Sequence, residues 1–182
     1  ALNNVSKSIG ELIGNNDMVA DALDANLASA NNKKSELEAA LAEAAAKDQS
    51  DPRWKELTDS LRQQVADAGL SVYEANAAII QNAIDATEKV FQRGEFLRGI
   101  SERGAALAER IGNRSGAFAT RQGNLAGRGV DLQSQRNSLQ ALLSNPAIAG
   151  NAKQIEDLTN KIAELDASIA ENSQDLKDLS LE

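Results

Sequence analysis

The fold is decided most clearly at residues 155–179, which read IEDLTNKIAELDASIAENSQDLKDL. Apolar side chains recur there at alternating intervals of three and four residues, and one position in the row is taken by Asn172. The row consists of Ile155, Leu158, Ile162, Leu165, Ile169, Asn172, Leu176 and Leu179. This seven-residue period is typical of a coiled-coil helix. Because the row is narrow and its surroundings are polar, the helix needs a partner helix to cover it.

The same spacing occurs in two segments nearer the N-terminus, residues 2–48 and 52–90. In the first, the row is Ile9, Ile13, Asn16, Ala20, Leu23, Leu27, Ala30, Lys34, Leu37, Leu41 and Ala44. In the second, it is Trp54, Leu57, Leu61, Val65, Ala68, Val72, Ala75, Ile79, Ala83, Ala86 and Val90. Both segments are predicted to be long amphipathic helices.

Short turn sequences separate the predicted helices. Asp51 is a suitable N-cap, and Pro52 fits the first helical position, where a missing N–H costs nothing. Asn151 and Gln154 form a plausible capping pair in front of the last helix. Because short turns join antiparallel neighbours, the sequence predicts a first hairpin over 2–90 and a second over 132–180. The expected fold class is all-α, with elongated antiparallel coiled-coil hairpins or a bundle of long helices, in one domain over 1–182.

A basic, glycine-rich middle, residues 91–131, lies between the two hairpins. Residues 91–136 carry a net charge of +4, whereas residues 1–90 carry −7 and residues 137–182 carry −5. Eight of the twelve glycines also lie in this stretch. Since each glycine weakens a helix, we expect at least one break, at Gly112–Gly116, and a second break would fall near Gly127–Gly129. A seven-residue row nevertheless runs through it at Val90, Leu97, Gly104, Ile111, Phe118, Leu125, Leu132 and Leu139.

The arginines of the middle allow two interpretations. Small residues permit close helix packing, in which the guanidinium groups would pair with acids of the neighbouring arms. Alternatively, the arginines bind a small anion, because guanidinium groups suit carboxylate and oxyanion contacts. The candidate anion or partner contacts are Arg93, Arg98, Arg103, Arg110, Arg114, Arg121 and Arg128. Membrane contact is the weakest interpretation, because the G-x-x-x-G spacings enclose polar residues.

Composition argues against several classes of function. The chain has no histidine and no cysteine, which usually supply nucleophilic, acid–base and metal-binding side chains, so we expect neither an enzyme nor a metal or cofactor site. A net charge of −8 argues against nucleic acid as a partner. No apolar run approaches the ~20 residues that a membrane helix needs.

The expected function is therefore structural or adaptor-like, with helical faces presented to a second copy or to a protein partner. The organisation is similar in style to the coiled-coil regions of exported bacterial assembly proteins, such as translocators and filament subunits of secretion systems. That resemblance implies a secreted or extracytoplasmic bacterial protein, although the composition fits cytosolic coiled coils nearly as well. The alternative is an extracytoplasmic helical-bundle sensor domain that binds a small anion through the arginines.

Overall fold

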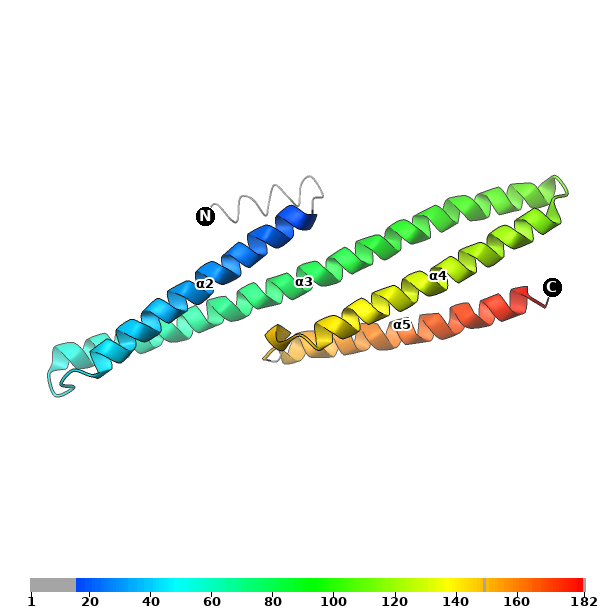
Figure 1. The fold of residues 1–182 in the computed structure, drawn as a ribbon. Coiled ribbons are helices and arrows are strands. Elements are labelled where there is room, and N and C mark those ends of the chain that lie inside the picture. The colour runs from blue at the N-terminus through cyan, green and yellow to red at the C-terminus, as the bar shows by residue number, and fades with distance from the viewer. Residues whose placement is uncertain (1–15, 149, 182) are drawn as a thin grey trace. The chain divides into compact units, whose positions relative to one another are not determined.

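The structure, a computed structural model, describes residues 16–148 and 150–181. Within these ranges the chain forms four α-helices and one short 3₁₀ helix, with no β-strand, which confirms the all-α class (Figure 1). The elements are α2 (Asn16–Ala45), α3 (Pro52–Arg110), α4 (Arg114–Leu143), η1 (Pro146–Ile148) and α5 (Ala152–Leu179). The predicted row positions Ile9 and Ile13 lie outside the described residues.

The chain divides into two compact units, Ala1–Asn82 and Ala83–Glu182, and α3 contributes residues to both. In the first unit, α2 runs beside the beginning of α3 (Figure 1). Its buried side chains include Leu23 and Ala44 of α2 and Leu61 and Ala68 of α3. All four belong to the rows that the sequence predicts, but the predicted Leu57 is 42% exposed and its neighbour Thr58 is buried instead.

In the second unit, α4 lies beside the later part of α3, and α5 lies beside α4 (Figure 1). Leu132 and Leu139 of α4 and Leu158 and Ile162 of α5 are all buried. The predicted row of α5 thus faces into the unit, together with its polar member, Asn172.

Local capping chemistry sets the helix boundaries, as the sequence predicts. The Asp51 carboxylate accepts a hydrogen bond from the backbone N–H of Arg53 at 3.0 Å, and Pro52 opens α3. The Asn151 side-chain oxygen accepts from the backbone N–H of Gln154 at 3.1 Å, and its amide donates to the Gln154 side-chain oxygen at 2.7 Å. The bonds from the backbone N–H groups of Arg53 and Gln154 satisfy donors that a helix N-terminus would otherwise leave unpaired.

The predicted break at Gly112–Gly116 is confirmed, because α3 ends at Arg110 and α4 begins at Arg114. Gly112 has a φ of 88°, a left-handed conformation that ends helices and favours glycine. Asn113 then caps α4 by accepting a hydrogen bond from the backbone N–H of Gly116. The expectation of a second break near Gly127–Gly129 is wrong, since α4 continues through both glycines.

The predicted row through the middle is wrong for α3. Val90 and Leu97 are 72% and 57% exposed, and Ile111, in the turn after α3, is 76% exposed, whereas the positions that face inward lie one residue after Val90, Leu97 and Gly104. These inward positions are Phe91, Arg98 and Ala105, which continue from the buried Ile84 at seven-residue spacing. One residue is a rotation of about 100° around a helix, so the apolar side of α3 faces outward here.

Candidate functional site

The interface between α3 and α4 is built around one arginine of the basic middle. Arg98 of α3 has a side chain that is only 16% exposed and contacts two carboxylates. Its guanidinium lies 2.6 Å from Asp131 of α4 and 2.7 Å from Glu95, one turn earlier on α3. Burial alone would lower the pKa of Arg98, but the hydrogen bonds with Asp131 and Glu95 outweigh it, so the pKa is raised. Arg98 therefore links the two helices as a permanent cation.

A glycine makes room for this contact. A Cβ placed on Gly94 would lie 2.7 Å from the Asp131 carboxylate and 3.0 Å from the Arg98 guanidinium. Neither distance is compatible with ordinary van der Waals contact, so a side chain here would displace the ion pair. The glycine content of the middle thus has a packing role at this position, as the close-packing interpretation expects.

Two arginines of α4 reach back to carboxylates of α3. Arg121 lies 2.9 Å from both Glu102 and Glu109, and these hydrogen bonds raise its pKa. Arg128 lies 3.5 Å from Glu95, the same carboxylate that Arg98 contacts. The side chains are partly exposed, so each pair contributes little to stability by itself. Together the contacts fix which faces of α3 and α4 meet.

These pairs differ from the arrangement that the sequence suggests. The carboxylates that pair with Arg98, Arg121 and Arg128 belong to the middle itself and not to the acidic arms. Among the described residues, one arginine of residues 91–136 reaches an acidic arm: Arg136 of α4, which lies 2.9 Å from Asp166 of α5. In the hairpin of α3 and α4, these three arginines lie nearer to acids of the middle than to acids of the arms.

The remaining candidate arginines are exposed: Arg93, Arg103, Arg110 and Arg114. In the described part of the chain, none of them lies within ion-pair distance of an acid. The positive charge of the middle is therefore presented to solvent by these four guanidinium groups. The structure separates the seven predicted contact residues into a paired inner set and an exposed outer set, and binding of an anion by either set stays a prediction.

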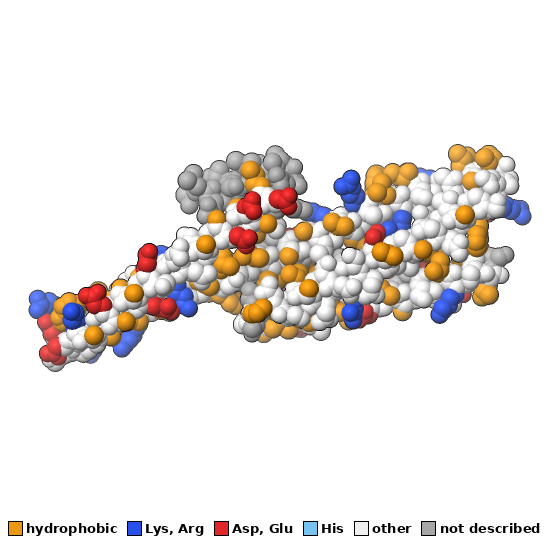
Figure 2. Space-filling model, viewed as in Figure 1, with side chains coloured by type: hydrophobic (Ala, Val, Ile, Leu, Met, Phe, Trp, Pro, Cys, Tyr) orange, Lys and Arg blue, Asp and Glu red, His pale blue; other side chains and the backbone are white. Residues whose placement is uncertain are grey.

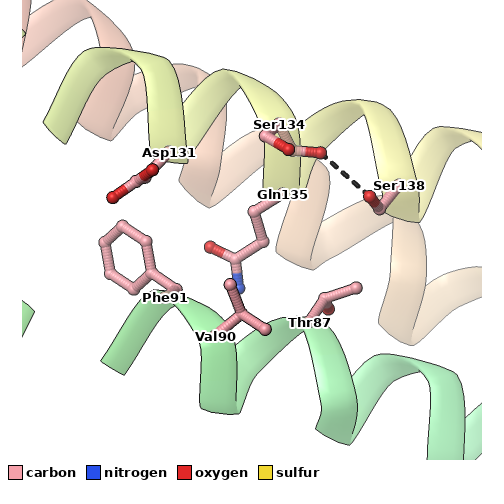
Figure 3. A pocket seen from close by; sticks show the side chains of 7 residues that line it. All are labelled: Thr87, Val90, Phe91, Asp131, Ser134, Gln135 and Ser138. Atoms are coloured by element: carbon pink, nitrogen blue, oxygen red, sulfur yellow. Dashed lines mark hydrogen bonds between the residues drawn. The ribbon is translucent and has the colours of Figure 1, made fainter. Parts of the chain in front are cut away.

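A small cavity of about 150 Å³ lies between α3 and α4 (Figure 3). Its lining consists of Thr87, Val90, Phe91, Asp131, Ser134, Gln135 and Ser138. The Ser138 hydroxyl donates to the backbone oxygen of Ser134, and the Asp131 carboxylate is held by Arg98. The Ser138 hydroxyl and the Asp131 carboxylate therefore already have partners within the protein. The volume is also below the ~300 Å³ at which small-molecule sites usually begin.

A second cavity, of about 230 Å³, is bounded by side chains of α3, α4 and α5. Its charged lining residues are Glu88, Arg128, Lys161 and Glu164, so cations and carboxylates are balanced. Lys161 lies 3.6 Å from Glu88, which leaves no surplus positive charge for an anion. Sequence reasoning missed Lys161 because nothing in its local sequence indicates which helix lies opposite. Within the described residues, no group of three or more acidic side chains could hold a metal ion.

The interface between α4 and α5 contains one buried polar contact. The Asn172 amide donates a hydrogen bond of 2.9 Å to the backbone oxygen of Leu125, which is already the helical acceptor for Gly129. A Cβ on Gly129 would lie 3.0 Å from the Asn172 amide nitrogen. The missing side chain of Gly129 therefore exposes the Leu125 carbonyl to Asn172. A polar contact of this kind fixes the register of two helices that apolar rows alone would leave free to slide.

Because of this contact, Gly129→Ala and Asn172→Ala are expected to be thermodynamically coupled. Alanine is favoured over glycine in a helix by roughly 1 kcal/mol, but in the native protein the added Cβ also disturbs a hydrogen bond of similar worth. Gly129→Ala should therefore be nearly neutral alone and stabilising by about 1 kcal/mol in the Asn172→Ala background. Urea unfolding of the four proteins of the cycle measures this coupling.

Gly123→Ala is the matched control, since an added Cβ there meets nothing within 4 Å. It should stabilise the protein equally with and without Asn172. If Gly129→Ala behaves like this control in both backgrounds, the assigned role of the Asn172 contact is wrong.

None of the described helices has a stretch that is long and apolar enough to cross a membrane. Comparisons with known proteins give no relative from which a function could be carried over: no protein-family model matches the sequence, and neither a curated protein nor a solved structure is significantly similar to it.

Proposed function

We propose that the protein is a non-enzymatic structural or adaptor module that binds other proteins through the faces of its helices. The observation that carries this proposal is the apolar side of α3 that faces solvent. Leu97, Ile100 and Leu107 are all more than half exposed, although the interior of the same unit is built from similar residues. Large apolar side chains that lie together at a surface are typical of an interaction site.

The proposed setting is an exported bacterial assembly, in which the chain would be one subunit or part of one. The support is the organisation of the molecule: all-α hairpins with narrow cores, whose remaining surface is long helical face. A secreted location belongs to the same proposal and rests on the resemblance in style alone.

Site-specific photocrosslinking in the cells that naturally make the protein tests this function. A photoreactive side chain at Leu97, Ile100 or Leu107 should give discrete protein adducts. The same group at Ala170 of α5, which is also exposed but has no apolar neighbours of this kind on its surface, is the control and should give none. Absence of adducts at all three α3 positions, in protein that circular dichroism shows to be folded, would overturn the proposal.

The anion-sensor alternative has less support. Arg98, Arg121 and Arg128 already have carboxylate partners, and a ligand would have to displace them. The exposed arginines offer an anion no enclosed site among the described residues, and exposed charge alone binds anions weakly. A thermal-shift screen with small carboxylates and inorganic oxyanions tests it, and stabilisation by one of them that is lost in Arg98→Gln would favour the sensor.

A further inference from the structure

The exposed side of α3 carries a set of large apolar side chains at regular spacing, which we call the outer row. It consists of the large apolar residues Val90, Phe96, Leu97, Ile100, Leu107 and Ile111. Val90, Leu97 and Ile111 occupy one seven-residue series, which Gly104 completes, and Ile100 and Leu107 occupy the companion series, which Arg93 begins. The outer row therefore has the same period as the buried rows of α5 and α2, but no described helix covers it.

Unpaired cations accompany the outer row. Lys89, Arg93, Arg103 and Arg110 are exposed on α3, and none has an acid within ion-pair distance in the described part of the chain. The acids of the same helix segment face the other way, where Glu95 and Glu102 pair with arginines of α4. Figure 2 shows hydrophobic side chains, in orange, gathered toward the α3–α4 turn with basic ones, in blue, beside them. This surface is thus both apolar and positively charged in a protein of net charge −8.

We infer that the outer row binds one acidic amphipathic helix of a protein partner, aligned along α3. The inference rests on the proposed function and names its partner class. Apolar residues of the partner at three- and four-residue intervals would pack between Leu97, Ile100 and Leu107. Asp or Glu beside that row would pair with Arg103 and Arg110, because flanking charges decide which helices associate.

A second copy of this chain fits the outer row poorly. Pairing of two outer rows would bring Arg103 and Arg110 of one copy near the same cations of the other, and like charges at such positions disfavour association. The acidic helices α2 and α5 do not supply an alternative, since Leu23, Leu158 and Ile162 turn their apolar rows inward. None of the helices described in this chain therefore suits the outer row, and we assign the partner helix to a different protein.

The spacing of the outer row also favours a helix, rather than a membrane surface, as its binding partner. A seven-residue row drifts by ~20° per heptad on a straight helix, so it winds around α3 and stays in contact only with a partner that winds with it. A flat lipid surface selects a broad face of period 3.6 instead. Arg93 and Gly104, which take positions of the same two seven-residue series, would add little to lipid binding, whereas a facing helix accommodates small and polar positions.

Fluorescence anisotropy with a labelled designed peptide tests the inference. The probe has about three heptads, Leu and Ile at the apolar positions and Glu at the flanking positions, where mutual repulsion keeps it from self-association. A peptide with Lys in place of Glu should bind the protein at least ~10-fold more weakly. The triple variant Leu97→Ser, Ile100→Ser, Leu107→Ser should also weaken binding of the Glu peptide by ~10-fold or more.

Matched variants separate the two contributions. Arg93→Gln, Arg103→Gln and Arg110→Gln together should weaken binding by several-fold, on the order of 3- to 10-fold, and reduce its dependence on salt. Leu57→Ser with Leu70→Ser removes two exposed leucines of α3 outside the outer row and should leave binding unchanged. All of these side chains are exposed, so each variant is expected to keep the circular dichroism spectrum of the native protein.

Evidence that the outer row binds a membrane or a second copy of the chain instead would overturn the inference. Binding to phosphatidylserine vesicles without binding to the Glu peptide would assign the outer row to membranes. A concentration-dependent dimer in sedimentation that the serine triple variant abolishes would assign it to a second copy. Failure of every probe while crosslinks form at Leu97 would refute the acidic helix but not the interaction function; failure of both would remove the function as well.

Discussion

Leu158→Asp is expected to unfold the second unit, residues 83–182. Leu158 is 0% exposed at the second position of the row on α5, and no lysine or arginine is among the buried residues that the structure describes in this unit. An uncompensated carboxylate in an apolar interior costs several kcal/mol, on the order of 3–5, which is a large part of the stability of a small domain. Circular dichroism at 222 nm and urea unfolding should show loss of helix or a much lower unfolding midpoint.

Ala163→Asp is the matched control for this variant. It places the same side chain on the same helix at an exposed position, where it should cost less than about 1 kcal/mol, mainly through helix propensity. Leu158→Asp that retains the native spectrum and unfolding midpoint would show that the α5 row is not the core of this unit, and the fold described here would be incorrect.

Leu132→Ala should lower the free energy of unfolding of the second unit by about 2–5 kcal/mol. Leu132 of α4 is 2% exposed, so truncation removes buried apolar contacts and leaves a cavity in a narrow core that has few other large side chains. Urea unfolding followed by circular dichroism measures the change. An effect near the upper end is expected if α3 and α5, which are held to α4 by ion pairs, cannot move inward to fill the space.

Val130→Ala provides the comparison, because Val130 lies two residues away on the same helix and is 70% exposed. Its truncation should change the free energy of unfolding by no more than about 0.5 kcal/mol. Equal effects of the two substitutions would mean that α4 presents a different face to its neighbours, and the assignment of buried and exposed rows in this unit would fail.

Much of the fold could be predicted locally. The boundaries at Asp51–Pro52 and Asn151 follow from capping groups that act within one helical turn. The break at Gly112 follows from a backbone conformation that glycine adopts readily. The rows of α2, of α5 and of the later part of α4 follow from spacing, whereas at the beginning of α4 the predicted Phe118 is 36% exposed and Ala117 is buried instead.

The candidate site was predictable as a set of residues but not as an arrangement. The sequence indicates that the arginines of the middle matter for packing or for contacts, and Arg98, Arg121 and Arg128 indeed lie where α3 and α4 meet. Their division into paired and exposed sets has no local signal. Which carboxylate an arginine meets depends on residues 12 to 33 positions away in the sequence, brought close by the turn at Gly112.

The clearest failure concerns α3 beyond residue 83. The sequence predicts that the more apolar row, with Val90 and Leu97, is buried, yet the buried row contains Phe91, Arg98 and Ala105. The inward side of α3 brings Arg98 to two carboxylates, and Gly94 on that side leaves room for the ion pair. The ion pair between Arg98 and Asp131 joins residues 33 positions apart, so no local pattern indicates which row of α3 faces inward.

The sequence by itself determined that the chain is helical, where most helices begin and end, and which faces of α2, of α5 and of the later part of α4 are covered. These properties depend on spacing, capping and backbone preference within a few residues. Only the tertiary structure decided which side of α3 is covered beyond residue 83, and therefore which arginines and leucines are left at the surface. Which side of α3 is covered depends on the side chains that the neighbouring helix presents to it. Those side chains are distant in the sequence, so no local pattern reveals them.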